Sequence, residues 1–136
     1  MLSPTLASVR IFLHVLAASV WVGGQIALAG VVPSLRRSHP TATKVVANAF
    51  ARVAWPAFGV AVLTGVWNLM AVDITTSSGG YQGTVLLKIA VAAASGIFAV
   101  VHANGRSKAA LAVGGALGAL TGIAAMYMGV LLHVGA

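Results

Sequence analysis

Four apolar segments dominate the sequence, and each is long enough to cross a lipid bilayer as a helix. A transmembrane helix needs about 20 consecutive apolar residues, because each residue adds about 1.5 Å and the hydrocarbon core is about 30 Å thick. Only 7% of the 136 residues are charged, whereas about 25% is typical of a soluble domain. The chain therefore lacks the polar groups that a water-facing surface requires, and we predict an integral membrane protein.

The predicted membrane spans cover residues 8–32, 52–72, 81–102 and 109–134. We expect the first span to end at Pro33, because proline interrupts the backbone hydrogen bonds of a helix. We also expect it to be retained, since its apolar run is longer than that of a cleavable signal peptide. The short connections favour an all-α, up-down four-helix membrane bundle that forms one domain over residues 1–136.

The basic residues gather at the ends of the spans, which explains the formal net charge of +7 without nucleic-acid binding. Basic connections face the cytoplasm in membrane proteins. The second connection contains no basic residue and holds Asp73, the only acidic side chain. We therefore expect a multi-pass protein of the plasma (inner) membrane with both termini outside. The basic residues beside the first and third connections are Arg36, Arg37, Lys44, Arg52, Arg106 and Lys108.

Polar side chains within the first span share one helical face. Arg10, His14 and Trp21 follow one another at spacings of four and seven residues, and Gln25 continues the same stripe. Polar groups inside a membrane usually face the bundle interior or a cavity. His14 is therefore a candidate ligand, with an interhelical hydrogen bond as its alternative role. Trp21 is a candidate cofactor contact or a packing residue.

The later spans carry three further ionisable groups. At about 1.5 Å per residue, Lys88 and His133 fall at a depth similar to that of His14, towards the outer face. His102 lies alone at the inner end of the third span. Each group also has a simpler interpretation: Lys88 extends to the outer interface, His133 is solvated near the chain end, and His102 is an interfacial residue.

The fourth span has a face of small residues. Gly114, Gly118 and Gly122 recur every four residues, a spacing that lets helix backbones approach closely in membranes. This pattern predicts tight helix packing within the chain, or association as a homo-oligomer or with a larger membrane complex.

Three segments of the sequence resemble known membrane families. They are "LHVLAASVWVGG" (13–24), "VLTGVWNL" (62–69) and "YQGTVLLKIAVAAASGIFAVVHANGR" (81–106). The first resembles the first helix of the copper-resistance D (CopD) membrane domain and of the HemJ-type protoporphyrinogen oxidases, and the other two are similar to the next helices of CopD domains. The HemJ resemblance implies that His14 binds haem b and that Lys88 is essential. The CopD resemblance implies copper movement across the inner membrane.

Charge favours haem over copper as the cofactor. Copper(I) prefers soft ligands, but the chain has no cysteine, and of its four methionines only Met126 shares a face with His133. The two propionates of haem could pair with Arg10 and Lys88, and two histidines could bind the iron. The ligands expected are His14 with His133, or His14 with His102.

We therefore predict a haem b-binding redox membrane protein whose organic partner is a quinone or a porphyrinogen. If the protein is an enzyme, it is expected to be an oxidoreductase with Lys88 as a catalytic residue. Two alternatives stay open. One is a CopD-like copper transporter that uses His14, Met126 and His133. The other is a non-catalytic helical subunit that packs through its glycine face.

Overall fold

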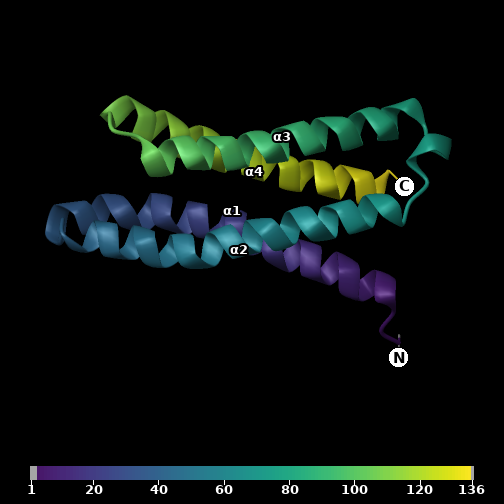
Figure 1. The fold of residues 1–136 in the computed structure, drawn as a ribbon, viewed down its shortest axis with the longest axis horizontal. Helices are drawn as coiled ribbons and strands as arrows, with labels where there is room; N and C mark the ends of the chain where they lie inside the picture. The colour runs from purple at the N-terminus through teal and green to yellow at the C-terminus, as the bar shows by residue number, and fades with distance from the viewer. Residues whose placement is uncertain (1–2, 136) are drawn as a thin grey trace. The chain divides into compact units, whose positions relative to one another are not determined.

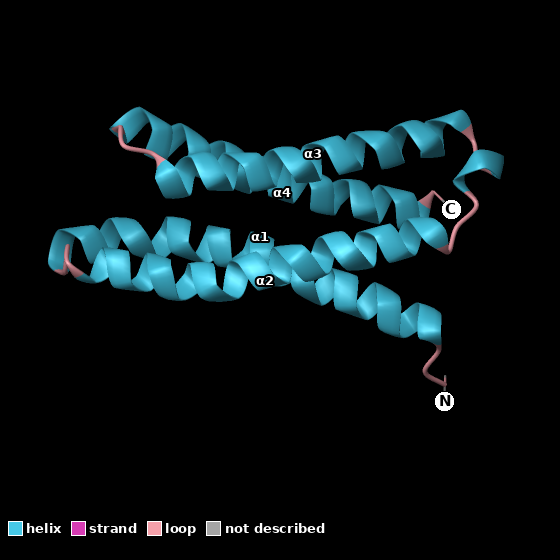
Figure 2. Cartoon of the chain, in the orientation of Figure 1, coloured by secondary structure: helices cyan, strands magenta, loops and turns pink. Residues whose placement is uncertain are grey.

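The computed structural model describes residues 3–135, and most of them are helical (Figures 1 and 2). No strand occurs among these described residues, so the predicted all-α class is confirmed. The elements in chain order are α1 (Leu6–Ser38), α2 (Ala42–Met70), the short 3₁₀ helix η1 (Ile74–Thr76), α3 (Gly79–Asn104) and α4 (Lys108–Val134).

The chain divides into two compact units, Met1–Val72 and Asp73–Ala136. In the first unit α1 packs antiparallel to α2, and in the second α3 packs antiparallel to α4 (Figure 1). Each unit is thus a helical hairpin with a short connection. The sequence also predicted that all four helices form one domain, and that part stays a prediction.

All four helices are long and apolar enough to cross a membrane. Large apolar side chains such as Phe12, Leu63 and Leu86 are well exposed on them, at 62%, 71% and 68%. In water such a surface would be costly, whereas lipid chains can cover it. The protein is therefore a multi-pass membrane protein whose helices contact the bilayer.

Side-chain caps define the starts of three helices. The Thr5 hydroxyl accepts from the backbone N–H of Ser8, whose own side chain accepts from the backbone N–H of Thr5. Ser78 and Ser107 likewise accept from backbone N–H groups in the first turns of α3 and α4. These bonds satisfy donors that the helix itself leaves unpaired, so the boundaries follow from local chemistry.

Two predicted boundaries differ from the structure. Helix α1 continues through Pro33 to Ser38, and α2 begins at Ala42 rather than near residue 52. Proline has a backbone angle that suits a helix, and it removes only one hydrogen bond from the ladder. Near the end of a span, headgroups and water can satisfy the carbonyl that loses its partner. The polar segment between the first two spans is therefore mostly helical.

The glycine face of α4 packs against α3. A Cβ atom added at Gly114 would lie 2.8 Å from the backbone nitrogen of His102 and 3.0 Å from the carbonyl oxygen of Phe98. One turn further along, the buried Ser95 hydroxyl donates to the carbonyl oxygen of Gly118 at 2.7 Å. The predicted close packing is confirmed, because only a residue without a side chain fits at Gly114. Association with other chains through this face stays a prediction.

Candidate functional site

His14 lies between α1 and α2 with one ring nitrogen fixed by two acceptors. Its Nδ1 is 2.9 Å from the carbonyl oxygen of Ala61 and 3.0 Å from the hydroxyl oxygen of Thr64. A carbonyl only accepts hydrogen bonds, and Thr64 directs its own hydroxyl hydrogen to the carbonyl of Val60 at 2.6 Å. The proton is therefore on Nδ1, and in the neutral imidazole the basic lone pair is on Nε2.

The α2 backbone is shaped to receive the His14 ring. A Cβ atom added at Gly65 would lie 3.3 Å from Cε1 of His14, so the absence of a side chain lets the ring approach α2 closely. Thr64, next to Gly65, is only 6% exposed. His14 itself is half-buried. The ring is thus held in one orientation by neighbours that leave it little freedom to rotate.

Arg10 repeats this arrangement one turn earlier on α1. Its Nε donates to the side-chain oxygen of Asn68 at 2.6 Å. Arg10 and His14 are four residues apart on α1, and their partners Asn68 and Thr64 are four residues apart on α2. Because the Asn68 bond uses Nε, the two terminal nitrogens of the guanidinium form the pair that suits a carboxylate.

The sequence pattern predicted the two polar residues on α1, Arg10 and His14. It did not predict their hydrogen-bond partners on α2. Thr64 and Asn68 both lie within the quoted segment "VLTGVWNL", where they interrupt an apolar run at a spacing of one helical turn. Their spacing of four residues could have indicated a polar face on α2, since residues four apart share one side of a helix.

Trp21 belongs to an aromatic cluster two turns from His14. Its ring centroid lies 4.5 Å from that of Phe58 and 5.2 Å from that of Trp55. The residue is 5% exposed, and its backbone carbonyl accepts from the Gln25 side chain at 3.1 Å. Trp21 is therefore a packing residue, which is one of the two roles predicted for it. A contact with a cofactor stays a prediction.

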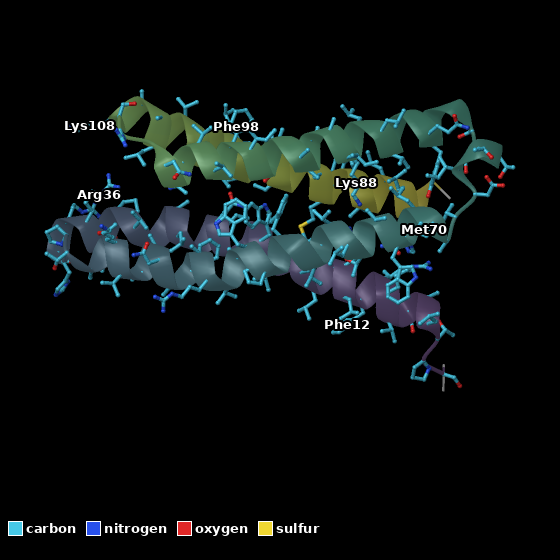
Figure 3. All side chains as sticks on the ribbon, viewed as in Figure 1. Phe12, Arg36, Met70, Lys88, Phe98 and Lys108 are labelled. Carbon is cyan, nitrogen blue, oxygen red and sulfur yellow. The ribbon has the colours of Figure 1, made fainter. Side chains whose placement is uncertain are left out.

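Lys88 reaches from α3 towards α4 (Figure 3). Its ammonium nitrogen would be 2.9 Å from a Cβ atom added at Gly129, so the glycine makes room for the charged group. The lysine is half-buried. His133 lies one turn beyond Gly129 on α4, so the second unit brings Lys88 and His133 to the same end of the hairpin, as their depths predicted.

Asp73, the only acidic side chain, hydrogen-bonds to a residue close to it in the sequence and not to Lys88. Its carboxylate accepts from the Thr75 hydroxyl at 2.6 Å and from the Thr75 backbone N–H at 3.1 Å. These bonds stabilise the charged carboxylate and lower the pKa of Asp73, with the Thr75 hydroxyl as the largest cause. Asp73 thereby caps η1.

The two histidines of the second unit lie at opposite ends of the α3–α4 hairpin. His102 is at the connected end, where its Nδ1 donates to the carbonyl oxygen of Leu111 at 2.6 Å and its ring lies close to Gly115. His133 is exposed in the last turn of α4. His102 therefore has the same protonated Nδ1 as His14, although it is more exposed.

Within the described residues 3–135, no three side chains of the His, Cys, Asp or Glu type gather as a metal-binding cluster. The predicted residues instead form two smaller arrangements, in which His14 lies beside Arg10 and Lys88 lies beside Gly129.

Comparison with models of protein families, with curated proteins and with solved structures finds no match to this chain.

Proposed function

We propose that this chain is a haem b-binding redox membrane protein in which His14 would bind the haem iron. The observation that carries the proposal is the hydrogen bond from Nδ1 of His14 to the Ala61 carbonyl. Metal-binding histidines commonly donate their second ring nitrogen to such an acceptor, which fixes the tautomer and makes the other nitrogen a better ligand. The Thr64 hydroxyl adds a second acceptor at 3.0 Å.

The described donor set fits haem. The porphyrin supplies four nitrogens to the iron, so the protein needs to provide only one or two ligands. Single histidines on separate helices meet that need, and a cluster of three is unnecessary. The second ligand in this proposal is His133, or His102 if the site lies nearer the connected end of α3 and α4.

Two cations would hold the propionates. Arg10 has its terminal guanidinium nitrogens in the pair geometry that suits a carboxylate, and Lys88 places an ammonium group beside Gly129. The single acidic side chain of the protein already bonds to Thr75. A ligand with two carboxylates would therefore balance charges that the protein leaves without an acidic partner.

Bound haem would supply one-electron transfer, and an organic partner such as a quinone or a porphyrinogen would exchange those electrons. In this proposal His14 holds the cofactor, Arg10 and Lys88 orient it, and the apolar helices exclude water. If the protein is an oxidoreductase, Lys88 is the proposed catalytic residue, because its ammonium group can donate a proton to a partner that gains electrons, and the amine form can accept a proton from a partner that loses them.

Metal and porphyrin analysis of the protein purified from membranes tests this function. We expect iron and protoporphyrin in equal amounts. Copper without porphyrin would contradict the proposal and favour the CopD-like alternative, in which His14, Met126 and His133 move the ion. Absence of both from a protein that also fails to take up added haem would favour a non-catalytic helical subunit.

Replacing Lys88 with methionine should weaken haem binding about tenfold, equal to about 1.4 kcal/mol. A hydrogen bond to a charged group contributes about 1.5–3 kcal/mol, and methionine keeps the apolar length while removing the charge. The iron's reduction potential should also fall, because a nearby positive charge favours the reduced centre. Haem titration and redox titration measure both effects.

The matched control for this variant is Lys108→Met, which removes the same charge at the start of α4. Lys88→Arg keeps the charge and should bind haem better than Lys88→Met. If Lys88→Met and Lys108→Met both retain the wild-type affinity and potential, Lys88 only extends to the interface and does not pair with the cofactor.

We also propose that the protein lies in the plasma (inner) membrane with both termini outside. The chain has no cysteine, so Ser77→Cys and Thr41→Cys each introduce a single thiol, in the second and first connections. A membrane-impermeant thiol reagent applied to intact cells should label Ser77→Cys and spare Thr41→Cys, because basic connections stay in the cytoplasm. The reverse labelling pattern would show the opposite orientation.

A further inference from the structure

Arg10 and Asn68 form a cluster of hydrogen-bond donors at the open end of the α1–α2 hairpin, opposite the connection between these helices. Arg10 uses its Nε to donate to the side-chain oxygen of Asn68 at 2.6 Å. The terminal guanidinium nitrogens and the amide nitrogen of Asn68 carry further N–H groups. Both residues are half-buried, so the two helices hold these donors in place.

The donor cluster needs an acceptor from outside the chain. Asp73 is the only acidic side chain, and its carboxylate accepts from the hydroxyl and the backbone N–H of Thr75. Donors at the surface of a membrane helix are costly when no acceptor meets them. An anionic ligand would supply the missing acceptors and balance the charge of Arg10.

The donor cluster and the His14 ring can contact the same ligand. Arg10 precedes His14 by four residues, so both lie on one face of α1, about 6 Å apart along the axis. Asn68 and Thr64 repeat that spacing on α2. Helical side chains lean towards the N-terminus of their helix, so Arg10 extends away from His14. A porphyrin carries its two carboxylates at one edge, at some distance from its centre, and matches this arrangement.

We propose that Arg10 and Asn68 together bind a carboxylate and thereby select porphyrins with free carboxylates. This inference rests on the proposed function and adds Asn68 as a binding residue. The terminal guanidinium nitrogens donate to the ligand carboxylate. Asn68 holds the guanidinium through its oxygen and donates to the same carboxylate through its amide nitrogen.

Binding of metal-free protoporphyrin and of its dimethyl ester to the full chain in detergent tests this site without iron. Porphyrin retained by the immobilised protein is measured by absorbance and compared with protein-free resin in the same detergent. Wild-type protein should bind the free acid about a hundredfold more tightly than the ester, about tenfold from each carboxylate. Equal affinity for the acid and the ester would overturn the proposal.

The variant Asn68→Asp separates ligand binding from helix packing. It keeps an acceptor for the Nε of Arg10 and should stabilise the contact between α1 and α2 against thermal unfolding, because the hydrogen bond becomes an ion pair. It also replaces the amide donor with a negative charge, so the preference for the free acid should fall about tenfold. If Asn68→Asp keeps the wild-type preference, Asn68 only joins the helices and the proposal is wrong.

The matched control is Asn48→Asp, which adds the same charge at an exposed position on α2 and should keep the wild-type preference. An equal fall in both variants would overturn the site, because only general electrostatic repulsion would then be present. A lipid phosphate is the other anion that such donors bind, so phosphatidylglycerol is added in excess. It should not displace the free acid, and full displacement would overturn the carboxylate assignment.

The metal-free probe also separates this inference from the proposed function. If haem fails to bind but the preference for the free acid is intact, His14 is not an iron ligand and the carboxylate site stands. If haem binds through His14 but the acid and the ester bind equally, the function stands and the carboxylate site is overturned.

Discussion

Replacing His14 with alanine is expected to abolish stoichiometric haem binding. The variant removes the proposed iron ligand, whose ring hydrogen-bonds to Ala61 and Thr64 through Nδ1, and alanine offers no lone pair to iron. The Soret absorbance of the purified protein should fall to the level of haem dissolved in detergent alone. An absorption spectrum normalised to protein concentration measures this loss.

The control for His14→Ala is His39→Ala, which removes an exposed histidine between α1 and α2 and should leave the spectrum unchanged. Helical content should be retained in both variants, because the apolar surfaces of α1 and α2 are untouched. A folded His14→Ala protein with an unaltered Soret band would remove His14 from the site. Loss of the band in His102→Ala but not in His133→Ala would place the second ligand at the connected end of α3 and α4.

Replacing Gly114 with alanine is expected to destabilise the α3–α4 hairpin by about 1–3 kcal/mol. The added Cβ would lie 2.8 Å from the His102 nitrogen and 3.0 Å from the Phe98 carbonyl oxygen. Both are backbone atoms, so the helices must separate to relieve the overlap. Reversible unfolding of the purified protein in mixed detergent micelles, followed by circular dichroism, measures the change in free energy.

The matched control is Gly59→Ala on α2, where an added Cβ meets no atom within 4 Å. That variant should be neutral or slightly stabilising, because alanine favours helix by up to about 1 kcal/mol over glycine. If Gly114→Ala is as stable as Gly59→Ala, α3 and α4 do not pack as closely at this position as the structure shows.

The membrane spans were predictable because their signal is long and local. About 20 apolar residues with charged ends specify a spanning helix without any knowledge of its neighbours. The exceptions are at the ends of α1 and α2. There Pro33 indicated a stop, yet helix continues to Ser38, and the polar segment from Ala42 onward is also helical. A single lost hydrogen bond is a weaker constraint than the rest of the helix around it.

The candidate site was predictable on each helix separately but not across helices. Helical spacing placed Arg10 and His14 on one face. It could not supply the register of α2 against α1, which brings Asn68 and Thr64 opposite them. The same reason explains Lys88, whose neighbour Gly129 is on another helix. Glycines at such contacts carry no polar signal, so their role becomes visible only once the helices are packed.

Haem binding by this helical membrane protein is measured by a haem titration of the empty wild-type protein. Haem is added to the protein in detergent, and the spectrum is compared with that of haem in matched protein-free micelles. We expect a shifted Soret band that saturates at one haem per chain. A spectrum indistinguishable from that of haem in empty micelles, from a protein with intact helical content, would contradict it.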